Sequence, residues 1–244
     1  MNEQPGGLGR KVPTDWTHVE AYPLRVALPE AVASVERTLV APSRLAVYMD
    51  QQREGACVGA SLTWLMEILN GPDPGPAKYR FFALYARARQ VDEWPGENYD
   101  GTSVRAGCDV LRKEGHTPFA KKHDEPWAWA PDPALGISEN RWASSIDELR
   151  ASISMGLPFV LGINWHSAFD TPETVKGESW IGRQAEWGTV RGGHAICAYA
   201  ASDKRQAFKL VNTWGLRYPR VWIPYTAVER LLAEEGEAVV VTDR

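Results

Sequence analysis

Cys57 stands at the point where a helix is expected to begin, and that position bears on its chemistry. Apolar side chains follow it at helical spacing, at Val58, Leu62, Leu65 and Leu69, before the breakers Asn-Gly-Pro at 70–72. A carbonyl carbon is attacked by the thiolate, and a free cysteine with a pKa of about 8.5 is mostly protonated at neutral pH. The partial positive charge of a helix N-terminus lowers that pKa. Cys57 is therefore a candidate nucleophile that needs a histidine from elsewhere in the chain.

The histidine with the most suggestive surroundings is His194, one of five in the chain. It lies in an apolar strand pattern and follows Gly192 and Gly193, which leave room for a substrate backbone to approach the ring. Taken alone, a histidine on a buried β face is more often structural than catalytic. Its assignment as a general base therefore depends on the partners that the chain supplies.

An orienting partner for His194 follows on the next expected strand, at Asn212, 18 residues further on (212 − 194). An antiparallel hairpin of that length can return the amide to the imidazole ring. An asparagine that accepts a hydrogen bond from one ring nitrogen fixes the tautomer and directs the other nitrogen at the sulfur. Trp214, two residues later, is expected to shield that bond from water.

The elements that must position these residues begin with four helices in the first two thirds of the chain. A Ser145-x-x-Glu148 capping box opens the last of them, and Gly115 suits the left-handed position after the third. The expected helices run from Cys57 to about residue 69, over 79–90, from a cap at Thr102 or Ser103 to Lys113, and from Ser145 to Gly156.

The C-terminal half changes to a strand-like pattern of short, apolar segments rich in β-branched residues. The expected strands cover 159–164, 194–200, 206–212 and 238–242, with a polar turn at 202–204. A helical half followed by a mostly antiparallel half predicts an α+β fold with a natural cleft between two lobes.

The first 45 residues differ from the rest of the chain. They are rich in Pro, Gly and mixed charge and show one plausible short strand near 37–40, so we expect 1–45 to form an irregular arm laid over the body. Residues 46–244 are expected to form the single folded domain, because units of about 200–250 residues are ordinary.

Composition excludes several classes of partner. A net charge of −4 and a pI near 5.8 argue against nucleic acid, which needs a basic footprint. No apolar stretch is long enough for a membrane span, and the N-terminus lacks the apolar core of a secretory signal, so a cytoplasmic location or release by lysis is expected. Three cysteines, Cys57, Cys108 and Cys197, have neither metal-site nor redox-motif spacing.

Taken together, the motifs resemble those of the papain-like cysteine peptidases. Gly55-Ala56-Cys57 matches the centre of the family signature C-G-[SA]-C-[WY], and His194 and Asn212 lie 137 (194 − 57) and 155 (212 − 57) residues on. Gln51 precedes the cysteine by six residues (57 − 51), where the family has its oxyanion glutamine. Segments 192–195 (Gly-Gly-His-Ala) and 212–215 (Asn-Thr-Trp-Gly) resemble two further family motifs, and Asp100-Gly101 resembles the wall that pairs with substrate backbone.

The resemblance implies a two-lobed papain-like fold, with a helical N-terminal lobe, an antiparallel β C-terminal lobe and the active site between them. It implies hydrolysis of peptide bonds through a thioester, with a peptide or protein substrate and without metal or organic cofactor. Acyl or peptidyl transfer, amidase activity and a catalytically inactive binding module on the same fold stay open. The implied site consists of Cys57, His194, Asn212 and Gln51, with Gly101, Gly192, Gly193, Ala195 and Trp214 at the substrate.

Some residues depart from the family pattern and bear on specificity and control. Glu54 replaces the first signature cysteine, Val58 replaces an aromatic residue, and Thr102 stands where a second wall glycine is common. Gln52 competes with Gln51 for the oxyanion position, although the family spacing favours Gln51. The segment before residue 50 is short and broken by Pro and Gly, so a long helical inhibitory propeptide is not expected.

Overall fold

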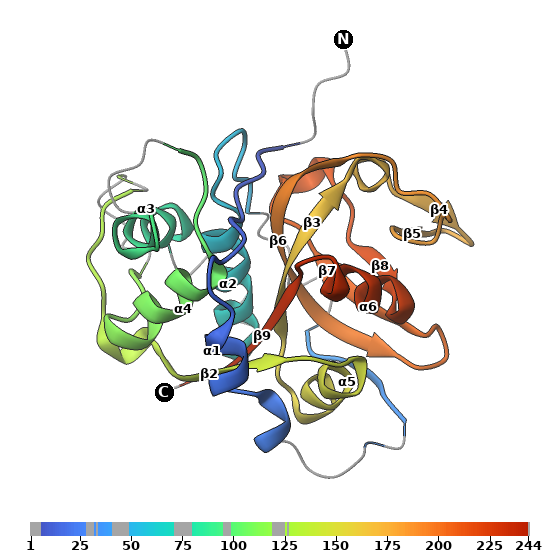
Figure 1. Cartoon of the computed structure of the whole chain (residues 1–244), viewed down its shortest axis with the longest axis horizontal. Helices are drawn as coiled ribbons and strands as arrows, with labels where there is room; N and C mark the ends of the chain where they lie inside the picture. The colour runs from blue at the N-terminus through green and yellow to red at the C-terminus, as the bar shows by residue number, and fades with distance from the viewer. Residues whose placement is uncertain are drawn as a thin grey trace.

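The helices of the first half of the chain and the large sheet occupy opposite sides of the molecule, as Figure 1 shows for this computed structural model of the chain. The structure describes residues 6–27, 32, 34–40, 49–70, 80–94, 99–118, 125 and 127–243. Three helices from the first half of the chain stand beside a large, mostly antiparallel sheet formed chiefly by the second half. The predicted α+β class and two-lobed arrangement are therefore confirmed.

The helical lobe is built around α2, and the elements of this half are α1 (Thr17–Ala21), α2 (Cys57–Leu69), α3 (Phe81–Val91) and α4 (Val104–Lys113). Most residues of α2 are buried, because α3 and α4 cover one side of it and the sheet covers another. The Ser103 hydroxyl accepts a hydrogen bond from the Ala106 N–H at 3.2 Å, so Ser103, and not Thr102, is the cap of α4.

The sheet lobe contains a nine-stranded sheet in the described part of the chain, with the order β2-β9-β3-β6-β7-β8-β5-β4 and β1 also paired with β6. The pairs are antiparallel except for β5 with β8. The strands are β1 (Glu36–Thr38), β2 (Ile137–Ala143), β3 (Phe159–His166), β4 (Glu173–Val175), β5 (Glu178–Trp180), β6 (Val190–Ser202), β7 (Ala207–Val211), β8 (Val221–Pro224) and β9 (Glu237–Asp243).

Alternate residues of the central strands enter two separate hydrophobic cores. On β6, Ala195 and Cys197 join the core shared with the helical lobe, whereas Ile196 and Ala198 join the core on the other side of the sheet. The second core is completed by α5 (Ile146–Met155) and α6 (Tyr225–Ala233), which lie on that side. The central sheet is therefore covered on both faces, and its strands read as nearly continuous apolar runs.

Agreement with the expected elements is closest where a local signal marks a terminus. The Ser145 hydroxyl caps α5, and Gly156 ends it in the left-handed conformation at φ 93°. Strands β2 and β8 and helix α6 were not predicted from the sequence. β2 has polar residues among its apolar ones and β8 has only four residues, so their local patterns are weak, and the pairing of β2 with β9 supplies what the local pattern lacks. Short 3-10 helices occur at Leu24–Val26, Pro133–Leu135, Ser167–Asp170 and Gly215–Arg217. In the described ranges, no helix is both long and apolar enough to cross a bilayer.

A buried histidine ties the turn after α4 to α2. Thr63 donates its single hydroxyl proton to the Gly59 carbonyl, at 2.7 Å, so the ring Nε2 of His116, 2.9 Å away, is the donor to Thr63 Oγ1. Burial disfavours the imidazolium and lowers the pKa of His116 from 6.5 to about 3. His116 is therefore neutral in the folded protein, a role that the sequence did not indicate.

Acid should destabilise the fold through this residue. Below the ordinary pKa of 6.5 the unfolded chain binds a proton that the folded chain does not bind until about pH 3. His116 then costs up to about 1.4 kcal/mol of unfolding free energy per pH unit in that window. We expect His116→Gln, whose amide can still donate to Thr63, to show a shallower loss of stability on acidification in urea unfolding. Equal slopes for the variant and the wild type would contradict this.

Candidate active site

Cys57 is the first residue of α2, and its side chain is fully buried between the lobes. Ala56 before it provides no side-chain cap, so the N–H groups of the first turn remain available to a ligand. Burial raises the pKa of the thiol from 9.0 to about 11. Backbone N–H groups of Ala195, Gly9, Val58 and Cys57 itself lie at the sulfur and act in the opposite direction.

His194 lies on β6 next to Ala195 and is also fully buried. Its Nε2 is 2.8 Å from Asn212 Oδ1, at the end of β7. The same Oδ1 accepts the Thr213 backbone N–H at 2.7 Å, which fixes the orientation of the Asn212 amide. Since an amide oxygen only accepts, Nε2 carries the proton and Nδ1 is the basic nitrogen. Nδ1 has no hydrogen-bond partner among the residues that the structure describes.

Two tryptophans enclose the imidazole of His194. The ring centroids of Trp165 and Trp214 lie 4.7 and 4.9 Å from it, and both indoles are fully buried. This dry surrounding lowers the pKa of His194 to about 4, partly offset by the hydrogen bond to Asn212. The neutral imidazole and the neutral thiol are therefore the favoured forms in this arrangement. Trp165, on β3, was not identified from the sequence.

Gln51 reaches this site because residues 49–51 pair with the segment after β7. The Gln51 N–H donates to Thr213 O at 2.8 Å, and the Gly215 N–H donates to Met49 O at 3.1 Å. Gln51 Oε1 accepts the Thr213 hydroxyl, so its Nε2 is directed the other way, to Glu54 O at 2.6 Å and Gly7 O at 3.2 Å. The Gln51 side chain is fully buried, whereas Gln52 is exposed.

A stretch of the N-terminal region, residues 6–11, runs between the two lobes across this site, and we call it the cleft segment (Figure 1). On the sheet side, the N–H groups of Gly9 and Arg10 both donate to Gly193 O at 3.0 Å. On the helical side, Thr102 N–H donates to Gly9 O at 2.8 Å, and Lys11 N–H donates to Thr102 O at 3.0 Å. The chain's own backbone thus bridges the two walls.

Glycines permit this close approach on both sides. A Cβ at Gly193 would lie 1.9 Å from Arg10 O, one at Gly101 would lie 2.2 Å from Gly9 O, and one at Gly9 would lie 2.1 Å from Gly55 O. All three distances are impossible for real atoms, so side chains at these positions would expel the cleft segment. Three glycines among residues 6–9 are the sequence signal that could have revealed the contact.

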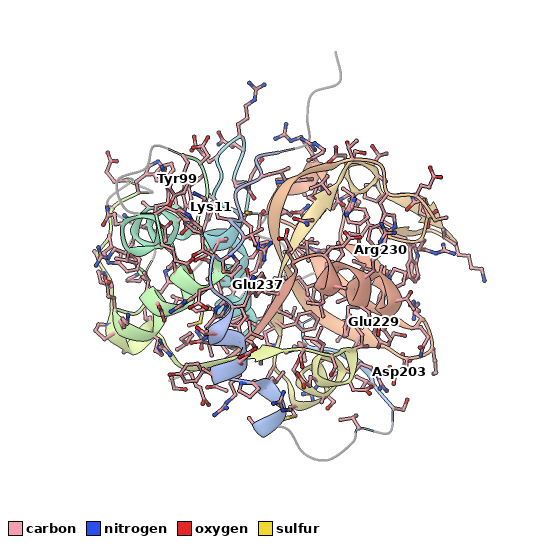
Figure 2. All side chains as sticks on the ribbon, in the orientation of Figure 1. Lys11, Tyr99, Asp203, Glu229, Arg230 and Glu237 are labelled. Atoms are coloured by element: carbon pink, nitrogen blue, oxygen red, sulfur yellow. The ribbon has the colours of Figure 1, made fainter. Side chains whose placement is uncertain are left out.

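A buried ion pair anchors the cleft segment to the sheet lobe. Arg10 Nε lies 3.0 Å from Glu237 Oε1 on β9, and both side chains are fully buried. Arg10 Nη2 also donates to Glu235 O at 2.8 Å, and His18 Nε2 lies 3.7 Å from Glu237 Oε2. Glu237 appears near the middle of the molecule in Figure 2. An unpaired charge at either position would be costly, so the pair holds the segment in place.

The structure brings the predicted site residues into one region. His194, Asn212, Gln51 and Trp214 are joined by hydrogen bonds, in part through Thr213, or by ring contact. The Cys57 sulfur receives backbone N–H groups of Ala195 and Gly9, and Gly101 and Gly193 lie against the cleft segment. A Cβ at Gly192, where φ is 153°, would lie 3.4 Å from the Leu8 side chain of the same segment. Thr213, which orients Gln51, was not identified, although its position next to Asn212 was the available signal. No group of side chains able to hold a metal ion occurs in the part of the chain that is described.

Comparisons with known proteins agree with this architecture. The sequence matches no protein-family model and no curated protein. Among solved structures, xylellain, a cysteine protease from Xylella fastidiosa, is similar with a TM-score of 0.71 and 21% identity over 100% of this chain and 98% of that one. Procathepsin B S9 from Trypanosoma congolense follows with 0.61 and 14% over 98% and 87%. Bromelain from Ananas comosus, in complex with the E64 inhibitor, gives 0.56 and 10% over 81% and 94%.

These likenesses establish the fold, because the TM-scores are high and the coverage is nearly complete although the identities are low. The chain has the two-lobed papain-like fold, as its resemblance to those peptidases predicted.

The cleft segment should control the ionisation of Cys57. Gly9→Val places a side chain against Gly55 O and expels the segment, so water returns to the sulfur and its pKa falls from about 11. We expect the rate of Cys57 alkylation by iodoacetamide, followed by peptide mass spectrometry, to level off at lower pH in the variant than in the wild type. Ala21→Val, on the exposed face of α1, is the matched control. Identical pH profiles for all three proteins would refute the idea.

Proposed function

We propose that this protein is a cysteine peptidase that hydrolyses peptide bonds with Cys57, His194 and Asn212. The observation that carries the proposal is the 2.8 Å contact between His194 Nε2 and Asn212 Oδ1, which leaves Nδ1 as a basic nitrogen on the strand that packs against the helix begun by Cys57. The papain-like fold supports the same conclusion. A structural role alone would not require a fully buried basic nitrogen without a partner in the described residues.

The nucleophile is generated by proton transfer from Cys57 Sγ to His194 Nδ1. The N-terminus of α2 stabilises the thiolate, and Asn212 Oδ1 stabilises the imidazolium through Nε2. Both charged forms are disfavoured by burial in the arrangement described above, where the pKa of Cys57 is about 11 and that of His194 about 4. Displacement of the cleft segment by substrate and water reduces that penalty, so the ion pair forms in the open cleft.

Acyl transfer then proceeds through a tetrahedral intermediate. The thiolate attacks the carbonyl carbon, and the oxyanion accepts hydrogen bonds from the Cys57 N–H and Gln51 Nε2. In support of this role, Gln51 Nε2 already donates to a peptide carbonyl, that of Gly7. His194 returns its proton to the leaving amine as the C–N bond breaks. Water, deprotonated by His194, attacks the thioester, and release of the acid restores the thiol.

The cleft segment lies where an extended substrate would bind, but it does not present a peptide carbonyl to the Cys57 sulfur for attack. The group of the segment at Cys57 Sγ is the Gly9 N–H, and the Gly9 carbonyl is engaged by Thr102. The segment is therefore held as an uncut occupant, and its displacement is part of turnover. The cleft segment occupies the site without forming a helix, unlike a long helical propeptide, which was not expected from the sequence.

Cleavage of a peptide library by the full chain tests the proposal. We expect hydrolysis by the wild type, faster hydrolysis by Gly9→Val, and none by Cys57→Ala, because only the last lacks a nucleophile. An epoxide that alkylates thiols should label Cys57 stoichiometrically in native protein and not in unfolded protein. Formation of an amide between the acyl group of the substrate and an added amine, in place of hydrolysis by water, would identify a transferase. Equal activity of Cys57→Ala and wild type would refute the assignment, and absence of both cleavage and labelling in Gly9→Val would indicate an inactive module.

The oxyanion role of Gln51 predicts a selective loss of turnover. Gln51→Ala should lower kcat by a factor on the order of 10²–10³ with little change in KM, because the amide acts on charge that develops in the transition state. Gln52→Ala, which changes an exposed side chain, is the matched control and should retain full activity. Steady-state kinetics decide between them. A loss confined to Gln52→Ala would mean that the neighbouring glutamine is the oxyanion donor.

A further inference from the structure

The side chain of Lys11, at the end of the cleft segment, is held by two aromatic rings. Its Nζ lies 4.0 Å from the ring centroid of Trp94 and 3.4 Å from that of Tyr99. Figure 2 shows Lys11 and Tyr99 beside each other on the helical side of the molecule. An ammonium over two ring faces is attracted by their quadrupoles, and we call Trp94 and Tyr99 the aromatic cage.

The aromatic cage opens onto the path of the substrate backbone. Lys11 donates its N–H to Thr102 O, and Thr102 donates its N–H to Gly9 O, so residues 9 and 11 flank the same wall residue. Gly9 is the residue whose N–H reaches the sulfur of Cys57. Two residues of extended chain span about 7 Å. A residue whose side chain lies in the aromatic cage is therefore two positions along the chain from the residue that lies at Cys57.

A single carboxylate joins the aromatic cage to the wall. Asp92, at the C-terminal end of α3, accepts the Tyr99 hydroxyl at 2.6 Å and the Thr102 hydroxyl at 2.7 Å through Oδ2. Its Oδ1 accepts the backbone N–H of Trp94 at 3.1 Å. None of these contacts involves the cleft segment, so the cage is held in place by the body of the protein and persists when Lys11 leaves.

Acidic groups offset the cations around the aromatic cage, so the ring faces decide its preference. The Arg89 guanidinium carbon lies 5.4 Å from the centroid of the Tyr99 ring, and its charge repels a second cation there. The Asp92 carboxylate, which accepts the Tyr99 hydroxyl, offsets that repulsion. Glu93, next to Trp94 in the chain, accepts the Thr14 hydroxyl at 3.0 Å and lies 3.8 Å from the Arg105 guanidinium, which balances its charge. An uncharged side chain would gain contact area in the cage without the attraction to the ring faces.

We propose that the aromatic cage is a substrate subsite for a lysine or arginine side chain, which the chain's own Lys11 fills while the cleft segment is in place. This inference rests on the proposed peptidase activity and names the substrate class that suits it: peptides with a cationic residue two or three positions from the scissile bond. The simpler reading, that the cage only anchors the cleft segment, predicts no preference among substrates.

The test uses the full chain with Gly9→Val and Lys11→Ala together, which empties both the cleft and the cage. Fluorogenic peptides carry lysine, arginine or norleucine at one scanned position, since norleucine keeps the aliphatic stem without the charge. We expect kcat/KM for the lysine and arginine peptides to exceed that for norleucine by about tenfold at a single position. Adding Trp94→Leu or Tyr99→Leu should bring this ratio to about one, whereas Tyr99→Phe, which keeps the ring, should retain most of it.

A binding measurement makes the result independent of turnover and of the folding of the cage variants. With Cys57→Ala added to the Gly9→Val, Lys11→Ala chain, calorimetry should show tighter binding of the lysine peptide than of the norleucine peptide by a similar factor. Equal affinities, or a preference that survives loss of either ring, would overturn the subsite. Cleavage without cation preference defeats this inference alone, whereas preferential binding of lysine without any cleavage defeats only the peptidase assignment.

Discussion

The packing of α2 on β6 is the contact on which the rest of the molecule depends. It joins the helical lobe to the sheet lobe through one core that contains Val58 and Leu62 from the helix and Ala195 and Cys197 from the strand. Because Cys57 begins α2 and His194 precedes Ala195, the same contact brings the thiol and the imidazole to the lobe interface. The residues that we propose as nucleophile and base thus depend on one apolar interface for their positions.

Exclusion of water at that interface explains the electrostatics of the site and, in the peptidase that we propose, its low activity while the cleft segment is bound. Burial shifts the pKa of Cys57 upward and that of His194 downward, so each change favours the neutral pair. The cleft segment completes the exclusion and is itself retained by the buried pair of Arg10 and Glu237. The cleft segment and the aromatic cage that holds its Lys11 then act together, because a substrate that displaces the segment must replace the contacts made at both places.

Much of the fold could be predicted because its signals are local. The capping box at Ser145, the left-handed Gly156 and the helical run after Cys57 each report on a few neighbouring residues. Elements without such signals were missed, such as β2, whose hydrogen bonds come from β9, about a hundred positions later. His116 reads as a loop residue in the sequence, yet contact with Thr63 of α2 makes it part of the interior.

By itself, the sequence determined which residue types were available for chemistry and in what order, so Cys57, His194, Asn212 and Gln51 could be singled out. Only the tertiary structure decided what surrounds them. The pairing of residues 49–51 with 213–215 directs the amide of Gln51, two tryptophans enclose His194, and the glycines of residues 6–9 bring the chain's own backbone to Cys57. These contacts join residues from distant parts of the chain. Spacing along the sequence does not show how close two such residues lie in space, because that distance depends on how the chain between them packs into both lobes.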